Sequence, residues 1–238
     1  MSDESLLKKA SETLPLLRGE TAGDELPPVF LRLDETGLSL CDADGLTIRG
    51  DFSKLLPRLK PNNLNGELLV KAARIKGNDA PIAVDATAGL GEDSLLLAAA
   101  GFRVRLFEQD PVIAALLSDA LERAAQNPEL SGIVSRMELV CGNSIEELPK
   151  LNYVPDVIVL DPMFPERVKS ASVKKKFQLI HQLERPCEEE EELLAAALAT
   201  GAHKIVIKRP LKGAALAGKK PSYSLTGKAI RYDVLVQA

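Results

Sequence analysis

The chain has 238 residues, of which 45% are hydrophobic and 27% are charged, and its formal net charge is −4. This length suits one α/β domain or a domain with a small appendage, and the hydrophobic fraction allows a sizeable core. The longest apolar runs, such as residues 95–100, are too short to cross a bilayer, and residues 1–10 lack the apolar core of a signal peptide. We therefore expect a cytoplasmic protein and not a membrane protein.

The cysteines and histidines argue against a metal site. Cys41, Cys141 and Cys187 lie far apart, and such a scattered, odd-numbered set does not predict a disulfide framework or a zinc site. The two histidines, His181 and His203, have no neighbouring ligand pattern. We expect reduced thiols, no bound metal and no histidine-based triad.

Positive charge is concentrated in two stretches of this acidic chain. Residues 204–231 contain eight basic residues and no acid, and residues 166–176 contain five basic residues and one acid. The acids gather elsewhere, notably in the run 188–192. Such a distribution predicts that the protein meets a polyanion at one face.

The first part of the chain predicts a small β-rich unit. Residues 27–34, 37–41 and 47–50 have the composition of short strands, separated by turns at Gly37 and at Asp44-Gly45. Residues 55–75 are expected to be partly helical and end at the Gly77-Asn78 break. We therefore predict an N-terminal subdomain over residues 1–77.

From residue 82 onward, apolar runs alternate with helical patterns. The patterns predict strands at 82–84, 104–107, 137–140, 157–160, 205–207 and 232–236, and helices at 93–100, 111–125, 172–183 and 188–200. This alternation predicts an α/β domain at 78–238, with a mostly parallel sheet covered on both faces. In such sheets ligands bind beyond the carboxyl ends of the strands. We interpret the Gly- and Lys-rich segment 211–228 as a loop that becomes ordered on the substrate.

A glycine turn follows the first strand of this domain, in the segment 84–93 (VDATAGLGED). Gly89 and Gly91 permit a tight turn and close approach of a ligand, and Asp93 or Ser94 is a candidate N-cap of the next helix. The segment lacks the third glycine of the dinucleotide fingerprint. The acids Asp85, Glu92 and Asp93 suit a positively charged ligand such as S-adenosylmethionine, because acids at a helix start repel a pyrophosphate.

Polar residues also follow the second and third strands. Glu108 lies 23 residues after Asp85, close to the spacing of about 20 typical of an acid that binds ribose hydroxyls. Asn143 and Ser144 follow the third strand, where small polar side chains can contact an adenine edge. These features predict a nucleoside site without distinguishing S-adenosylmethionine from a nicotinamide cofactor.

The fourth strand leads into Asp161-Pro162-Met163-Phe164-Pro165, which is similar to the Asp/Asn-Pro-Pro-Tyr/Phe loop of amino-methyltransferases. An exocyclic amine of a base is a poor nucleophile because its lone pair is delocalised into the ring. Asp161 and a nearby backbone carbonyl can accept both N–H bonds, while Phe164 stacks on the base. Pro162 fixes the backbone, so that the acceptors are placed in advance. A base held in this way must be flipped or unpaired.

Basic residues flank this loop and follow the fifth strand, at the edge where a phosphate backbone would pass. We predict RNA contacts from six of them: Arg167, Lys169, Lys174, Lys175, Lys208 and Arg209.

Together these motifs resemble the ribosomal RNA small subunit methyltransferase J family. The most specific segments are 84–93 (VDATAGLGED), 159–165 (VLDPMFP) and 206–210 (VIKRP), and the resemblance covers most of residues 75–233. It implies a Rossmann-like class I methyltransferase that uses S-adenosylmethionine to methylate the exocyclic N2 of a guanine in small-subunit (16S) ribosomal RNA, free or within a ribosomal particle.

The resemblance also implies cofactor contacts, by motif position, from Glu92, Asp93, Glu108, Gln109, Asn143, Ser144 and Asp161. The chain departs from the usual family pattern at three of these places. Glu92 and Gln109 each replace an arginine, and Asn143-Ser144 replaces a pair of serines. Asp85, Glu108 and Asp161 are retained.

Two other classes of function are compatible with parts of the sequence. A nicotinamide-dependent oxidoreductase would share the ribose acid but has no use for the loop 161–165. A non-catalytic RNA-binding assembly factor would share the fold and the basic stretches but does not need a pair of acceptors for an amine. On the loop alone, a DNA or protein amine is also a possible target.

Overall fold

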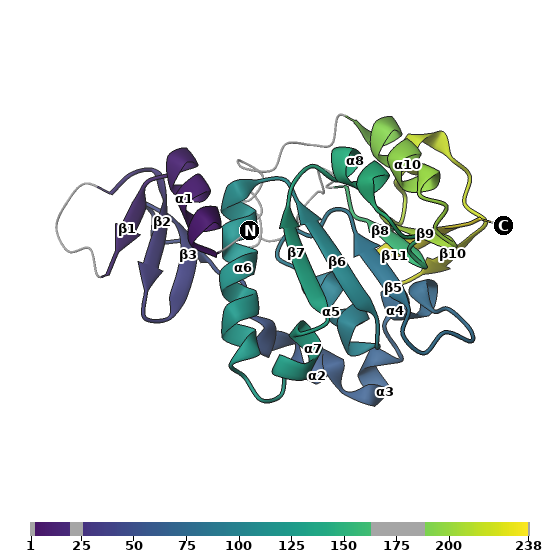
Figure 1. Ribbon diagram of the computed structural model, residues 1–238, viewed down its shortest axis with the longest axis horizontal. Coiled ribbons are helices and arrows are strands. Elements are labelled where there is room, and N and C mark those ends of the chain that lie inside the picture. The colour runs from purple at the N-terminus through teal and green to yellow at the C-terminus, as the bar shows by residue number, and fades with distance from the viewer. Residues whose placement is uncertain (1–2, 20–25, 163–188, 238) are drawn as a thin grey trace.

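The structure, a computed structural model, describes residues 3–19, 26–162 and 189–237. Figure 1 shows a large twisted sheet flanked by helices, with a small sheet beside it at the N-terminal end of the chain. The large sheet has seven strands in the order β10-β11-β9-β8-β5-β6-β7. Its strands are β5 (Ile82–Asp85), β6 (Arg103–Glu108), β7 (Met137–Cys141), β8 (Val157–Leu160), β9 (Lys204–Pro210), β10 (Tyr223–Thr226) and β11 (Ile230–Val236).

Five of these strands are parallel, and β11 runs antiparallel to both β9 and β10. The helices that accompany them are α5 (Glu92–Ala99), α6 (Pro111–Ala125), α7 (Ser131–Val134), α8 (Ser144–Glu147) and α10 (Glu190–Ala199), with 3₁₀ turns η2 (Leu148–Lys150) and η3 (Leu216–Gly218). The prediction of a mostly parallel, Rossmann-like sheet is confirmed.

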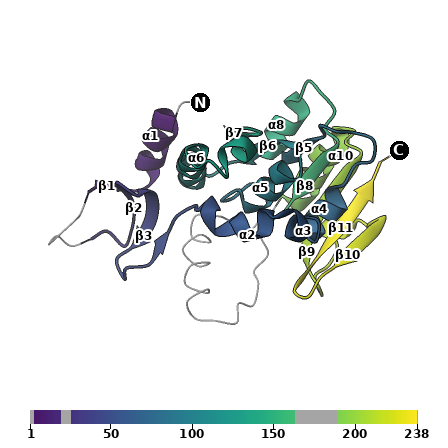
Figure 2. The ribbon, with the colours of Figure 1, turned by 90° about the horizontal axis from the view of Figure 1, so that it is seen from below.

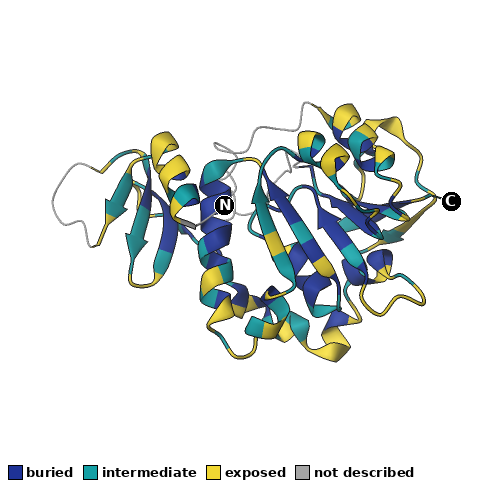
Figure 3. Ribbon diagram, in the orientation of Figure 1, coloured by how far each residue is buried: buried dark blue, intermediate teal, exposed yellow. Residues whose placement is uncertain are grey.

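The central strand β8 explains why the sheet is covered on both faces. Its four residues are all buried. Val157 and Val159 pack in one hydrophobic cluster with α5, whereas Ile158 and Leu160 pack in a second cluster with α10. Figure 3 shows the same burial along the middle of the sheet. A strand buried on both faces has a continuous apolar sequence instead of an alternating one.

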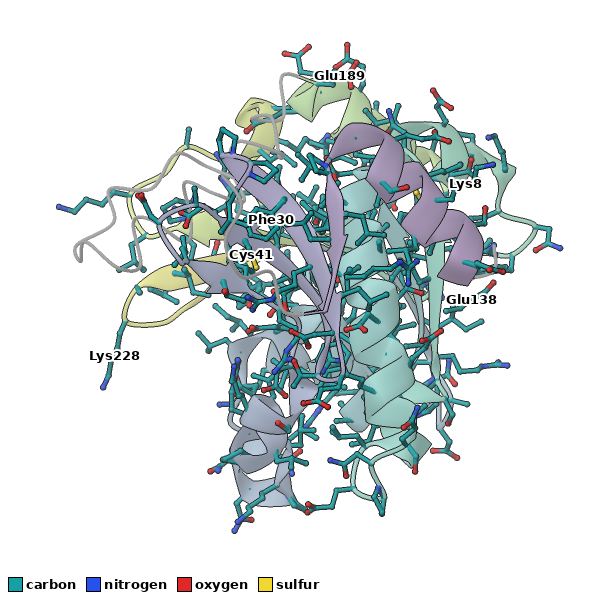
Figure 4. All side chains as sticks on the ribbon, turned by 90° about the vertical axis from the view of Figure 1, so that its left-hand side faces the viewer. Lys8, Phe30, Cys41, Glu138, Glu189 and Lys228 are labelled. Carbon is teal, nitrogen blue, oxygen red and sulfur yellow. The ribbon has the colours of Figure 1, made fainter. Side chains whose placement is uncertain are left out.

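The small sheet has the order β1-β2-β3-β4 and contains β1 (Leu16–Arg18), β2 (Val29–Asp34), β3 (Gly37–Asp42) and β4 (Thr47–Ile48). The β-rich N-terminal unit is therefore confirmed. Helix α1 (Asp3–Thr13), which we did not predict, packs with this sheet against α6. Figures 1 and 2 both show α1 beside α6. Phe30 on β2 and Cys41 on β3 are register partners, and both are buried. Figure 4 labels the two side chains.

Residues 52–73 form short helical pieces, as expected for a segment that is only partly helical. They are η1 (Phe52–Leu55), α2 (Leu56–Leu59), α3 (Pro61–Leu64) and α4 (Leu68–Ala73). Phe52, Leu69 and Ala73 pack into the cluster that covers one face of the large sheet. The domain boundary after residue 77 stays a prediction.

Two expectations from the sequence need correction. Helix α5 is capped by Gly91 in the left-handed conformation (φ 76°) and begins at Glu92, so neither Asp93 nor Ser94 is its N-cap. The segment 211–228 is not a loop throughout, because β10 pairs with β11 and Leu216 is buried. Strand β10 has only four residues, and the surrounding glycines and lysines give the segment the composition of a loop.

The predicted helix 172–183 lies outside the described residues. Within the described ranges, no helix is both long enough and apolar enough to cross a membrane.

Candidate active site

Asp85 ends β5 and is buried at the carboxyl edge of the large sheet. Its carboxylate accepts hydrogen bonds from the Thr87 backbone N–H at 3.1 Å and from the Ser94 hydroxyl at 2.6 Å. Burial raises the pKa of Asp85 to about 6, and the nearby carboxylates of Asp93 and Asp161 act in the same direction. A bound cation would offset this accumulation of acids.

Gly89 and Gly91 each serve the turn for a different structural reason. Gly89 has a φ of 53°, and its backbone N–H donates to Glu108 Oε2 at 2.9 Å, which ties the turn to β6. Gly91 has a φ of 76°, and a Cβ placed on it would stand 2.7 Å from Leu117 Cδ1 and 3.2 Å from Phe52 Cζ. Gly91 therefore lets the turn lie against the core.

Glu108 ends β6 and is only 7% exposed. Its carboxylate accepts from the backbone N–H groups of Asp110 at 2.8 Å and Gly89 at 2.9 Å, one on each oxygen. Burial raises the pKa of Glu108 to about 7 against the pull of these two hydrogen bonds. A carboxylate oxygen can accept two bonds, so each oxygen keeps capacity for a ribose hydroxyl. Gln109, the next residue, is exposed.

The end of β7 lies beside Glu108, since Cys141 is the register partner of Glu108. Asn143 caps α8, and its side-chain oxygen accepts from the Ile145 backbone N–H at 2.9 Å. Ser144 is buried at the first position of that helix. The structure thus brings Asn143 and Ser144 to the same edge as the ribose acid.

Asp161 directly follows β8, and its position is fixed through both backbone and side chain. Its backbone N–H donates to the Thr87 hydroxyl at 2.7 Å. One carboxylate oxygen, Oδ2, lies 2.8 Å from Lys208 Nζ. The same ammonium lies 2.9 Å from Asp93 Oδ2, so Lys208 bridges two predicted cofactor contacts. Pro162, the next residue, is buried.

The environment of Lys208 keeps it charged. Burial alone would lower its pKa, but the carboxylates of Asp93 and Asp161 outweigh that effect and raise it above the usual value for lysine. Tyr232, the register partner of Lys208 on β11, is buried, and burial raises the pKa of its phenol.

Residues of the glycine turn, Asp161 and Lys208 surround a cavity of about 260 Å³, whose lining does not include Glu108, Asn143 or Ser144. Asp85, Asp93, Asp161 and Lys208 form its charged side. Its apolar side includes Leu40 and Ile48 of the small sheet and Ile113 and Leu116 of α6. The predicted cofactor contacts that line it are Asp85, Gly89, Glu92, Asp93 and Asp161. One pocket therefore joins the glycine turn, the acid after β8 and the N-terminal unit.

The predicted RNA contacts are only partly described. Lys208 lies in the cavity, as stated above. Arg209 is 4% exposed, and its Nε donates to the Ala214 carbonyl at 2.8 Å, while one terminal nitrogen lies 3.5 Å from Glu190. A phosphate contact from either residue stays a prediction. Five predicted residues lie outside the described part of the chain: Phe164, Arg167, Lys169, Lys174 and Lys175.

Sequence reasoning missed four contributors to this site. The hydroxyls of Thr87 and Ser94 hold Asp161 and Asp85, and their only signal was their position beside the glycine turn. Leu40 and Ile48 reach the cavity from the small sheet, and no local pattern marks such a long-range contact.

No group of three histidine, cysteine or acidic side chains that could hold a metal occurs among residues 3–19, 26–162 and 189–237. Cys41 and Cys141 are present as thiols. His181 and Cys187 lie outside the described residues.

The chemistry of the cavity fits S-adenosylmethionine, which has a sulfonium, an ammonium and a ribose diol. Asp85, Glu92 and Asp93 supply negative charge near the glycine turn. Glu108, tied to that turn through Gly89, supplies acceptors for a diol.

Comparisons with known proteins agree with this fit. A family model described as "Putative SAM-dependent methyltransferase" matches residues 21–237. The chain is 45% identical over 235 residues to a ribosomal RNA small subunit methyltransferase J from Thioalkalivibrio sulfidiphilus, covering 95% of this chain and 90% of that protein. It is 47% identical over 211 residues to the protein of that name from Pseudomonas fluorescens, covering 86% and 81%.

A crystal structure of a SAM-dependent methyltransferase from Neisseria gonorrhoeae superposes with a TM-score of 0.75 at 33% identity, covering 98% of this chain and 92% of that one. The residues of the cavity, the sheet order and these similarities agree. The chain belongs to the family of SAM-dependent methyltransferases that includes the proteins named ribosomal RNA small subunit methyltransferase J.

Proposed function

We propose that this protein transfers a methyl group from S-adenosylmethionine to the exocyclic N2 of a guanine in small-subunit (16S) ribosomal RNA. The observation that carries the proposal is the position of Asp161, which lines the same cavity as Asp85 and Asp93 at the carboxyl edge of the sheet. The names of the relatives at 45% and 47% identity support ribosomal RNA as the substrate. An enzyme with this substrate works in the cytoplasm.

S-adenosylmethionine supplies an electrophilic methyl group when it is bound. Asp85 and Asp93 stabilise the cationic end of the cofactor, and Glu108 accepts hydrogen bonds from its ribose. Gln109, Asn143 and Ser144 contact the adenosine end of the cofactor, and Glu92 contacts the cofactor at the rim of the pocket.

Asp161 and the backbone carbonyl of Pro162 accept the two N–H bonds of the target amine. This pair draws the nitrogen lone pair out of conjugation and directs it at the methyl group. Phe164 stacks on the flipped base, and Arg167, Lys169, Lys174 and Lys175 hold the phosphates of the flanking strand.

The test is a map of methylated guanines in small-subunit RNA, made by mass spectrometry from cells with and without the gene. We expect one N2-methylguanine to disappear on deletion and to return when the wild-type gene is restored. Asp161→Ala should fail to restore it. Asp79→Ala, which changes an exposed acid before β5, is the matched control and should restore it.

An unchanged map on deletion would refute the proposed substrate. Tight RNA binding without turnover on small-subunit particles would favour a non-catalytic assembly factor instead. Restoration of the modification by Asp161→Ala would remove the role proposed for that carboxylate.

A further inference from the structure

Lys208 lines the cavity, and the mechanism proposed above gives it no part. Its ammonium is held between Asp161 Oδ2 at 2.8 Å and Asp93 Oδ2 at 2.9 Å, and its side chain is 26% exposed. Strands β8 and β9 are neighbours in register, which brings Lys208 next to Asp161 at the carboxyl edge (Figure 1). Lys208 is therefore fixed in position and still open to a ligand in the cavity.

The ammonium has capacity for one further partner. A lysine has three N–H donors, and the described residues supply carboxylate acceptors for two of them. The third donor lies beside the carboxylate that is proposed to receive the target amine. Asp161 has two acceptor oxygens, and the ammonium of Lys208 lies 2.8 Å from one of them, so in the cavity the pair can offer a base a row of two acceptors followed by a donor.

This row is complementary to one base edge. Guanine presents two neighbouring donors, N2–H and N1–H, followed by an acceptor, O6. Adenine and cytosine present one amine donor next to a ring-nitrogen acceptor. If that donor pairs with Asp161 Oδ2 and the ring nitrogen with Lys208 Nζ, the amine lies one position away from the place of the guanine N2 amine. A flipped base is selected through such hydrogen bonds to its Watson–Crick edge.

We propose that Lys208 is a specificity-determining residue, whose ammonium donates a hydrogen bond to O6 of the flipped guanine while Asp161 receives N1–H and N2–H. This inference rests on the proposed function and names the group that selects its substrate. Asp93 anchors the ammonium from the other side and so sets its direction. A hydrogen bond from a charged donor is worth a selectivity of roughly 10- to 100-fold.

The test compares guanine with 6-thioguanine, which keeps the N2 amine and N1–H but replaces O6 by sulfur, a weak hydrogen-bond acceptor. Small-subunit RNA is prepared by ligation with either base at the mapped target position. We expect wild-type kcat/KM to favour guanine by roughly 10- to 100-fold. In Lys208→Met we expect activity on guanine to fall until the ratio between the two bases approaches one. Lys208→Arg keeps a cationic donor and should retain part of the preference.

Lys71→Met, which changes an exposed lysine on α4, is the matched control and should leave the ratio unchanged. Calorimetric binding of S-adenosylmethionine to Lys208→Met verifies that the variant is folded. An equal loss on both bases in Lys208→Met would overturn the proposal, since a purely structural role affects both alike. Equal wild-type activity on guanine and on 6-thioguanine would also overturn it, while leaving the proposed function intact. Failure of the wild type on both RNAs would count against the proposed function itself.

Discussion

The two halves of the candidate active site hold their acids in different ways. On the side of β5 and β6, Asp85 and Glu108 are buried and receive hydrogen bonds from backbone N–H groups and from the Ser94 hydroxyl. On the side of β8 and β9, Asp161 is partly exposed and lies 2.8 Å from the ammonium of Lys208, which also reaches Asp93 of α5 at 2.9 Å. The first half is fixed by the main chain, and the second by side chains that can exchange partners.

The difference matches what each half has to bind. A cofactor is the same in every turnover, so a rigid set of acceptors reduces the cost of ordering the site. A base must enter, be recognised and leave, so its partners need to be reachable and must re-form their own contacts afterwards. The ion pair between Lys208 and Asp161 supplies such a contact in the absence of a base.

The largest effect that separates the halves is expected from Asp161→Ala. Loss of the acceptor for the amine should lower kcat by about 10³-fold, as for other groups that act on a developing charge. Binding of S-adenosylmethionine should persist within about tenfold, because Asp85 and Glu108 remain in place. Single-turnover kinetics and calorimetry measure the two quantities. Equal losses in binding and in kcat would show that the halves are not separable.

The rigidity of the first half depends on Gly91. Gly91→Ala would strain a positive φ and push a Cβ to 2.7 Å from Leu117, so we expect a loss of about 2–4 kcal/mol in the free energy of unfolding. Gly45→Ala is the matched control, because Gly45 has a similar φ of 87° with nothing within 4 Å, and it should lose only about 1 kcal/mol. Urea unfolding measures both. Equal losses would mean that packing around Gly91 is not what holds the turn.

The sequence predicted the first half better than the second, for a physical reason. Asp85, Gly89 and Glu108 occur at strand ends within one βαβ unit, so local spacing was enough to place them together. Lys208 is 47 residues from Asp161 in the chain, and their contact depends on the pairing of β8 with β9. For this lysine the sequence predicts a phosphate contact, which stays a prediction, but charge alone does not reveal that its ammonium pairs with Asp93 and Asp161.

Arg209 and Lys228 show the same limit of sequence reasoning. The basic stretch predicts an RNA contact for Arg209, which stays a prediction, but it does not reveal that Arg209 is buried and donates to the Ala214 carbonyl. Lys228, in the same stretch, is exposed and extends outward from the turn between β10 and β11 (Figure 4). A count of positive charges therefore cannot separate a structural arginine from a surface lysine.

A smaller effect, confined to the first half, is expected from Glu108→Gln. The amide keeps one acceptor but turns its NH₂ group toward a backbone N–H, so we expect the Kd for S-adenosylmethionine to rise roughly 10- to 100-fold. The kcat at saturating cofactor should change little, because Glu108 is remote from the amine. Glu138→Gln is the matched control, since Glu138 is an exposed acid on β7 (Figure 4). A fall in kcat without a change in Kd would contradict the assignment.

The smallest effect is a pH dependence that Glu108 should impose in opposite directions on stability and on binding. Its pKa is about 7 in the folded protein against 4.5 for an unperturbed glutamate, so its contribution to stability is full below about 4.5 and is lost as the pH rises through 7. Binding should follow the reverse trend, because ribose hydroxyls donate to the ionised carboxylate. Affinity is then expected to fall up to about tenfold for each pH unit below 7 and to level off above it.

Glu108→Gln isolates this effect from the other acids. The substitution has a cost that does not depend on pH, since a backbone N–H loses its acceptor at every pH. Between pH 5 and pH 8 the melting temperature of the wild type should therefore fall relative to that of the variant. The variant should also lose the pH dependence of S-adenosylmethionine binding that Glu108 contributes, leaving only that of Asp85, whose pKa of about 6 lies lower. Parallel curves for the two proteins across this range would show that Glu108 does not titrate there.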